Sequence, residues 1–509
     1  MARLVVVGGG LGGLAVAIRS QAAGHQVTLV ERRAQVGGRA YQFQESGYTF
    51  DMGPTIITAP ELLESLWATA GRNLHDDVKL VPMRPCYDLR FRSGGELSYW
   101  SDSEAMVEEI AAFAPGDVAG YHRFMRDTAT VYKRAFDDLG RQSFDSLLGF
   151  AKLVPELMRL GGYMSVYRYV SRYFKDERLR AAFSFHPLFI GGSPFRASAL
   201  FSIIPYLEQR GGVWFAEGGT YSVVAAMARL FTSLGGELRC GDGVQQVIVS
   251  NDRAAGVLLE SGVAITADAV VSNADTADTY LHLVPPSNRR HFSDRKVRGM
   301  HYSMSCFLLY LGTDRQYPEL RHHTIVMPRD YRKAVNGIFA GHLIEDDLAL
   351  YLHLPSHTDP SLAPPGGEAM YALVPVPNLK GDLDWPEAGD RLRDAAIGIL
   401  RDELGMTDIE RHIVVERRFT PLDFRDQLAS HLGAAFSLEP TLLQAGYFRP
   451  HNRSEDLPGL YLVGAGTHPG AGIPGVLMSA EITAGLLAGD FPLAPVGAKA
   501  RTSEVMVPR

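Results

Sequence analysis

Cysteine is scarce in this chain, with three residues in 509. They lie far apart, and no two have the short spacing of a metal-binding pair. An odd number of distant cysteines does not form a disulfide framework, so we expect reduced thiols in a cytosolic setting. The three residues are Cys86, Cys240 and Cys306.

Long apolar stretches are also missing. No segment offers 18 consecutive apolar residues, which argues against a membrane-spanning helix. Met1-Ala2-Arg3 runs directly into four apolar residues and then into glycines, a pattern that does not match a secretory signal.

Neither sign of charge dominates the composition. There are 50 basic and 57 acidic residues, a net charge of −7, which gives no support to a nucleic-acid-binding protein. Apolar residues make up 46% and charged residues 21%, which excludes a largely disordered chain. A globular protein of several domains is expected at this length.

A glycine-rich motif follows the first apolar run. Residues 3–7 are typical of a strand buried on both faces, and Gly8, Gly10 and Gly13 fit the pattern G-x-G-x-x-G. Residues 11–22 then show helical spacing. Glu31 ends the next strand pattern, where a carboxylate can accept hydrogen bonds from ribose hydroxyls. The segment predicts a dinucleotide site with the diphosphate at a helix N-terminus.

Two further segments favour FAD over NAD. Gly37-Gly38-Arg39 follows closely and brings backbone and a guanidinium toward a diphosphate. In Asp51-Met52-Gly53-Pro54-Thr55, the glycine allows a flat ring to approach the main chain. Near the other end of the chain, residues 464–475 hold five more glycines between a strand and a helix pattern. The N-terminus of that helix would stabilise negative charge on a reduced flavin.

Strand and helix patterns of this kind occur in three separated blocks. We therefore predict an α/β fold with a discontinuous Rossmann-like FAD-binding domain, an inserted substrate domain with a mixed sheet, and a helical membrane-associating region. The expected boundaries are 1–70, 214–290 and 431–490 for the three parts of the FAD-binding domain, 71–213 for the helical and substrate region, 291–430 for the mixed-sheet substrate domain, and 491–509 for a loose C-terminal tail.

The helical region contains a locally basic window. Between residues 147 and 180, seven Lys and Arg residues stand against three acidic ones among aromatic and aliphatic side chains. An ordinary solvated helix face explains this pattern, and so does contact with an anionic membrane surface.

The motifs together resemble those of the bacterial and fungal type of phytoene desaturases, a carotenoid desaturase branch of the FAD-dependent amine-oxidase-like proteins. The resemblance runs from Arg3 to about Leu487. Besides the segments above, it rests on Gly211–Trp214, Gly218–Thr220, His301–Ser305, His322–Thr324 and Arg449–Arg453 leading into Leu460–Gly475.

The resemblance implies non-covalent FAD, a hydrophobic polyene substrate and a cytoplasmic protein associated peripherally with a membrane. It also implies that oxygen or a quinone accepts the electrons. The residues expected to bind FAD are Gly8, Gly10, Gly13, Glu31, Gly38, Arg39, Gly53, Pro54, Thr55, Val244, Gly466, Gly475 and Val476.

Desaturation of a polyene removes a hydride and a proton, and the flavin accepts the hydride. No carboxylate pair or catalytic triad is recognisable from spacing. Glu208 and His468 are weak candidates for handling the proton, and we expect that positioning against the flavin dominates. His342, His353 and His357 lack metal-ligand spacing, so no metal site is predicted.

Two alternatives stay open at this stage. A sister enzyme of carotenoid metabolism, such as a hydroxycarotenoid desaturase, an apocarotenoid oxidase or a carotene isomerase, would share these motifs. A non-catalytic prenyl-lipid binding protein of the GDP-dissociation-inhibitor type has a similar fold, although the complete nucleotide motif with Glu31 and Arg39 speaks against it.

Overall fold

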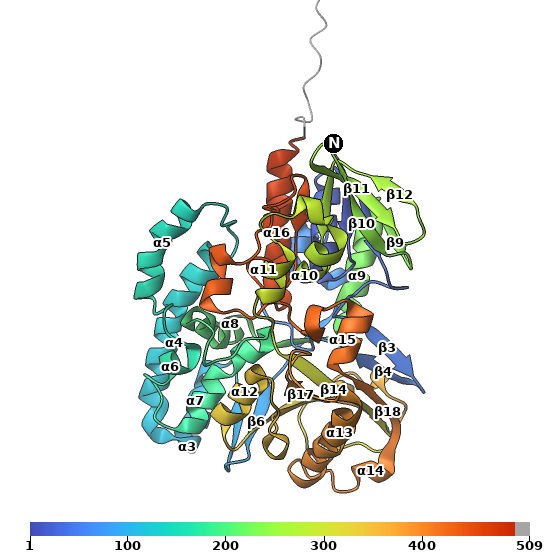
Figure 1. The fold of residues 1–509 in the computed structure, drawn as a ribbon. Helices are drawn as coiled ribbons and strands as arrows, with labels where there is room; N and C mark the ends of the chain where they lie inside the picture. The colour runs from blue at the N-terminus through green and yellow to red at the C-terminus, as the bar shows by residue number, and fades with distance from the viewer. Residues whose placement is uncertain (494–509) are drawn as a thin grey trace, which may run out of the picture.

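The structure is a computed structural model, and it describes residues 1–493. Most of the tail expected at 491–509 therefore lies outside the described residues. Figure 1 shows two sheet-containing parts one above the other, with a layer of helices along one side.

A five-stranded parallel sheet forms the upper part in Figure 1. Its strands come from the beginning, the middle and the end of the described chain and pair side by side. The three central strands are rich in valine, which suits strands covered on both faces. In spatial order they are β19 (Leu460–Leu462), β13 (Ala269–Ser272), β1 (Arg3–Val7), β2 (Gln26–Glu31) and β9 (Glu237–Cys240).

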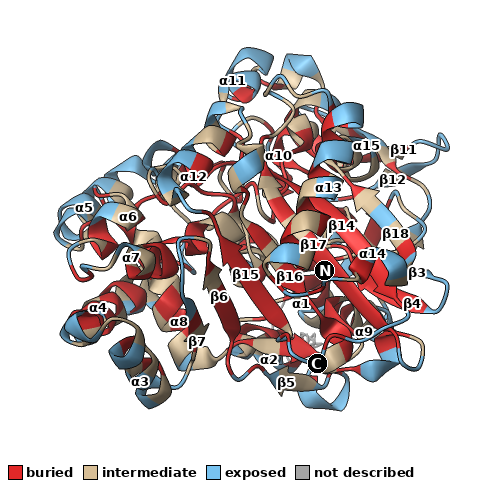
Figure 2. Cartoon of the chain, turned by 90° about the horizontal axis from the view of Figure 1, so that it is seen from below, coloured by how far each residue is buried: buried red, intermediate tan, exposed pale blue. Residues whose placement is uncertain are grey.

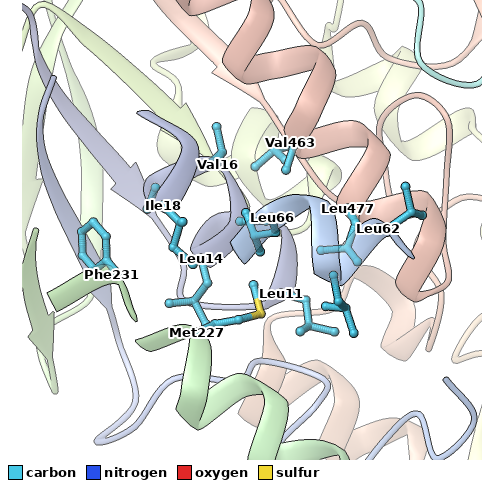
Figure 3. Close-up of a cluster of buried hydrophobic side chains, with 14 of the residues drawn as sticks. Leu11, Leu14, Val16, Ile18, Leu62, Leu66, Met227, Phe231, Val463 and Leu477 are labelled. Atoms are coloured by element: carbon cyan, nitrogen blue, oxygen red, sulfur yellow. The ribbon is translucent and has the colours of Figure 1, made fainter. Parts of the chain in front are cut away.

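Four helices pack with this sheet around one apolar core. Leu14 and Ile18 of the first helix meet Met227, Phe231 and Leu477 of two others there (Figure 3). The repeat of apolar residues at helical spacing is what places these side chains on one face. The helices are α1 (Leu11–Ala22), α2 (Pro60–Thr69), α9 (Thr220–Ser233) and α16 (Ile473–Asp490).

A seven-stranded mixed sheet forms the lower part. Its pairs are antiparallel except for β15 with β6, which run parallel. In spatial order the strands are β18 (Ile413–Phe419), β14 (Ser305–Thr313), β17 (Glu368–Val376), β16 (Leu350–His353), β15 (His323–Met327), β6 (Tyr87–Phe91) and β7 (Glu96–Tyr99).

The remaining strands form small antiparallel units. They are β10 (Val244–Ser250), β11 (Arg253–Leu259) and β12 (Ala264–Thr266) in one sheet, β3 (Gln42–Glu45) with β4 (Tyr48–Asp51), and β5 (Leu80–Pro82) with β8 (Trp214–Ala216). The other helices outside the helical layer are α10 (Thr276–Asp278), α11 (Asp294–Gly299), α12 (Tyr331–Ala340), α13 (Trp385–Asp402), α14 (Ile409–His412) and α15 (Pro421–Leu428).

The helical layer combines packed helices with one exposed helix. Within the basic window, the apolar side chains of α6 and α7 are mostly buried in a core of their own, whereas α5 has no buried residue. Figure 2 shows α5 at the rim of the molecule. The helices of the layer are α3 (Ser103–Phe113), α4 (Val118–Tyr132), α5 (Leu147–Arg159), α6 (Val166–Val170), α7 (Glu177–Ser184) and α8 (Ile204–Gly211). None of the described helices is long and apolar enough to cross a membrane.

Short 3₁₀ and π-helical turns connect these elements. They are η1 (Leu74–Asp76), η2 (Pro115–Asp117), η3 (Lys133–Asp138), η4 (His186–Ile190), η5 (Ala199–Ile203), η6 (Thr279–Leu283), η7 (Pro286–Asn288), η8 (Glu345–Asp347), η9 (Pro355–His357), η10 (Pro360–Leu362), η11 (His431–Gly433), η12 (Leu442–Gln444) and η13 (Gly446–Phe448).

Candidate functional site

One large cavity, about 890 Å³ in volume, connects the parallel sheet with the mixed sheet and the helical layer. Twelve of the thirteen residues predicted to bind FAD line it. The exception is Gly13, which lies where α1 meets β1. A Cβ atom on Gly13 would stand 2.1 Å from the Gly8 carbonyl oxygen, so glycine is needed there for close packing of the helix on the strand.

The N-terminus of α1 opens into the cavity. Gly8 has a φ of +94°, which favours glycine, and the chain then turns into the helix at Leu11. No described side chain caps this helix, so its first amide groups are available to an anion. Glu31 ends β2 beside the turn, where its Oε2 accepts a hydrogen bond from the Gly9 amide at 2.7 Å.

Arg39 lies in the cavity wall and is held by side chains from distant segments. Its Nη2 donates to the Ser430 hydroxyl at 2.6 Å and lies 3.3 Å from a buried Asp275 carboxylate oxygen. Asp275 and Ser430 were not predicted as site residues. The signal available for Asp275 was the pair of polar residues Asn273 and Asp275 directly after the buried strand β13.

The segment Gly53–Thr55 is packed tightly against the arginine segment and the mixed sheet. A Cβ atom on Gly53 would stand 1.8 Å from the Arg39 carbonyl oxygen. From the mixed sheet, Tyr371 donates to the Gly53 carbonyl at 3.0 Å, and the hydroxyls of Thr55 and Tyr351 are 2.6 Å apart. The segment is therefore fixed from both sides where it lines the cavity.

Asp51 ties the same region to α9. Its carboxylate accepts hydrogen bonds from the backbone amides of Thr220, at 2.6 Å, and Tyr221, at 3.3 Å, at the N-terminus of that helix. Burial raises the pKa of Asp51 to about 7 although both hydrogen bonds favour the charged form.

A second helix N-terminus faces the cavity from the C-terminal glycine cluster. Gly472, with a φ of +91°, precedes α16, and no described side chain caps that helix. The buried Arg449 supports the cluster by donating to backbone carbonyls of Ala465, at 2.6 Å, and Thr467, at 3.2 Å. Burial lowers the pKa of Arg449 to about 10.

Val244 and Gln245 at the start of β10, and Glu260, also line the cavity. Asn273, which was not predicted, fills the space beside the glycine motif and donates to the Gly8 carbonyl. These features fit FAD. The uncapped N-termini of α1 and α16 suit its negatively charged groups, and Glu31 at the end of β2 suits a ribose. The glycines of segment 8–13 and Gly53 leave room for the diphosphate and the ring, and we call this part of the cavity wall the dinucleotide cradle.

The other half of the cavity is apolar. Aromatic and aliphatic side chains dominate its wall, and the cavity continues to α5 and to residues 442–446. The lining includes Phe144, Phe150, Leu157, Phe185, Leu188, Phe189, Leu200, Phe201, Ile203, Ile204, Leu207, Ile325, Met327, Leu373 and Leu442.

The two weak catalytic candidates both line the cavity, in different surroundings. Glu208 is buried and accepts a hydrogen bond from Tyr87 at 2.9 Å, and its Oε2 lies 3.3 Å from His186 Nε2. His468 stands edge-to-face with Phe144, 4.7 Å between ring centroids. Burial lowers the pKa of His468 to about 3, so the ring is neutral at physiological pH.

Three histidines gather behind the cavity wall. One ring nitrogen each of His322, His323 and His353 lies within 4.8 Å of the others, which is a possible metal-binding arrangement. Of the three residues considered from the sequence, only His353 belongs to this group, and His357 instead lies 2.7 Å from a Glu368 oxygen. The prediction that the chain holds no metal stays a prediction.

Comparison with known proteins identifies relatives over nearly the whole chain. The model of the family of flavin-containing amine oxidoreductases matches residues 11–488. A lycopene-forming phytoene desaturase from Pseudescherichia vulneris is 46% identical over 494 residues, which cover 96% of this chain and 100% of that protein. A neurosporene-forming phytoene desaturase from Cereibacter sphaeroides is 42% identical over 497 residues, covering 97% and 95%.

Solved structures show the same fold. An oxidoreductase from Methanosarcina mazei superposes with a TM-score of 0.60 at 18% identity, covering 94% of this chain and 98% of that one. At this identity the likeness shows the fold alone.

Proposed function

The chain belongs to the flavin-containing amine oxidoreductases, within their phytoene desaturases, and from this membership we infer that it is an FAD-dependent oxidoreductase that desaturates a linear carotene. The resemblance noted from the motifs is confirmed. The observation that carries the function is the single cavity that joins a dinucleotide cradle to an apolar half. A non-catalytic prenyl-lipid binding protein would have no use for the cradle.

One half of the cavity is suited to the cofactor and the other half to the substrate. FAD, when bound, supplies the hydride acceptor. The uncapped N-termini of α1 and α16 favour its negatively charged groups, and Glu31 is placed for the ribose. The apolar wall excludes water and holds an extended hydrocarbon by contact along its length, so that successive carbons can be aligned with the ring.

Pigment analysis tests the substrate directly. The chain is co-expressed with enzymes that supply phytoene, and we expect phytoene to be replaced by coloured carotenes with longer conjugation. The same host with an empty vector is the control. Phytoene that accumulates unchanged, in cells that contain the flavin-loaded protein, would reject this function and favour one of the sister carotenoid enzymes.

We propose further that the protein associates peripherally with a membrane through one apolar patch. The patch consists of exposed side chains of α5 and of the neighbouring turns η12 and η13. Phe150 joins them, since its ring stacks on Tyr447 at 6.0 Å and meets Phe448 at 5.7 Å. The exposed members are Leu147, Leu148, Val154 and Met158 of α5 and Leu442, Leu443 and Phe448 of the turns.

Two observations support this proposal. Leu148 and Leu443 are 78% and 74% exposed, although both are large apolar residues. The apolar half of the cavity reaches the patch, because Phe150, Leu157 and Leu442 line it. A substrate that dissolves in the bilayer would thus enter without crossing water. An electron acceptor of the quinone type would be available at the same surface, with oxygen as the alternative.

Vesicle flotation tests the patch. Replacing Leu148 and Leu443 by Asp should lower binding to vesicles of phosphatidylcholine and phosphatidylglycerol by about 10-fold or more, because two apolar side chains are lost and two negative charges are added. The matched control replaces Val263 and Val414, also exposed but on other parts of the surface, by Asp. Equal flotation of both double variants and the wild type would contradict the proposal.

A further inference from the structure

A chain of hydrogen-bonding groups leads from the cavity into the mixed sheet. Thr55 and Tyr351 line the cavity, and their hydroxyl oxygens are 2.6 Å apart. The Tyr351 hydroxyl also lies 2.7 Å from Nδ1 of His323, a residue of the neighbouring strand β15 with 1% of its surface exposed. Tyr351 therefore connects the wall of the cavity to a buried imidazole.

The series of hydrogen-bonding side chains continues beyond His323. Its ring stacks on His353 with 5.2 Å between centroids and an angle of 14°. The Nε2 atoms of His353 and His322 are 3.1 Å apart, and His322 Nδ1 lies 2.6 Å from the hydroxyl of the partly exposed Thr358.

One gap interrupts this series of contacts. His323 Nε2 and His353 Nδ1 are buried and have no hydrogen-bond partner among the described residues. One ring nitrogen of each histidine lies within 4.8 Å of one nitrogen of the other two. The relay proposed below needs a water between His323 Nε2 and His353 Nδ1.

All three imidazoles are neutral. Burial lowers the pKa of His322, His323 and His353 well below the usual value, and the neighbouring imidazoles lower it further. The other titratable groups around the cluster are Tyr371, edge-to-face with His353, and His357, which Glu368 holds. A neutral imidazole accepts a proton on one nitrogen and releases one from the other, so such a series can conduct protons.

We propose that Tyr351 is a catalytic residue that receives the proton lost by the substrate, and that His323, His353 and His322 pass it toward Thr358. This inference rests on the proposed desaturation. Loss of a hydride leaves positive charge on the polyene, so the adjacent C–H bond becomes strongly acidic. A phenol backed by an imidazole is then a sufficient base, although neither group is a strong base alone.

The step balances in atoms and electrons. FAD, when bound, would accept one hydrogen together with the electron pair of its C–H bond. The electron pair of the neighbouring C–H bond becomes the new π bond, and its proton passes to the Tyr351 oxygen while the phenolic proton moves to His323 Nδ1. His323 then releases the proton on Nε2 toward His353 and is left protonated on Nδ1. Before the next turnover, the ring has to lose the Nδ1 proton and regain one on Nε2.

Rapid mixing of the FAD-loaded protein with phytoene in liposomes without oxygen tests the relay, with the absorbance of the more conjugated carotene as the signal. In Tyr351→Phe and in His323→Gln, we expect this rate to fall by about 100-fold. The wild-type rate should slow in D₂O, and this solvent effect should disappear in Tyr351→Phe, because the substrate hydrogens themselves do not exchange. Tyr310→Phe is the matched control, since its buried hydroxyl has no partner among the described residues and does not line the cavity.

Two further measurements separate a relay from a structural role. FAD affinity, followed by flavin fluorescence, should be unchanged in His323→Gln, because His323 does not line the cavity. Nitrogen-15 spectra of the histidine rings should show His323 protonated at Nε2 in the wild type and shifted at Nδ1 in Tyr351→Phe. Rates and solvent effects equal to those of the wild type in both variants would overturn the relay. One equivalent of zinc in the purified protein would overturn it as well and assign the imidazoles to a metal.

The failure of the proposed function looks different. In that case the wild type itself would not react with phytoene. If both the wild type and Tyr351→Phe convert phytoene at the same rate, the proposed function stands and only the relay is rejected.

Discussion

Gly53→Ala is expected to give a protein that folds but is isolated without flavin. The new Cβ atom would stand 1.8 Å from the Arg39 carbonyl oxygen and 2.9 Å from its carbonyl carbon, far inside van der Waals contact. Both neighbours are backbone, so no side chain can turn away. Segment 53–55 would have to leave the position that Tyr371 and Tyr351 give it, and the cavity wall would change there. FAD affinity should fall by about 100-fold or more, because a displaced wall no longer matches the shape of the cofactor.

Flavin content after purification and the dissociation constant for added FAD measure this effect. Gly398→Ala is the matched control, because the glycine lies inside α13 and a Cβ atom there would meet nothing within 4 Å. Alanine should stabilise that helix by about 0.5–1 kcal/mol and leave FAD binding unchanged. A flavin-loaded Gly53→Ala protein with wild-type affinity would show that the segment adapts.

The contiguous motifs could be predicted from the sequence because their chemistry is local. Gly8, Gly10 and Gly13 lie within six residues, and the strand, turn and helix around them follow from the hydrophobic pattern. Val244 was placed by resemblance, and it lines the same cavity. In the glycine motif, the residues that form the site are neighbours in the sequence, so the sequence pattern alone is sufficient to predict them.

Residues that act through tertiary contacts could not be predicted in this way. The relay depends on the pairing of β15 with β16, which sets His323 opposite His353, and no spacing in the sequence encodes that register. The basic window likewise contains both an exposed helix and buried helices. The sequence does not distinguish them, because aromatic residues beside cations occur in helices of both kinds. Only the packing of α6 and α7 distinguishes them from α5.

Arg449 belongs to this second group, and its removal should have the other large effect. It is 2% exposed and donates to four backbone carbonyls, from two segments that meet at the cavity. Arg449→Met keeps much of the volume but leaves those carbonyls without their charged donor. We expect the free energy of unfolding to fall by about 3–5 kcal/mol, because buried acceptors lose hydrogen bonds that water cannot replace. The accepting carbonyls belong to Leu438, Gln444, Ala465 and Thr467.

The same change should weaken FAD binding, since Ala465 and Thr467 belong to the glycine cluster before α16. Urea unfolding and the temperature of flavin release measure the two effects on one preparation. Arg449→Lys, which keeps the charge but not the planar fork of donors, should fall between Met and the wild type. Arg411→Met, at an exposed position of α14, should change neither quantity. If Arg449→Met unfolds at the same urea concentration as the wild type, water must bind the four carbonyls in its place. Arg449 would then not be what supports the glycine cluster before α16.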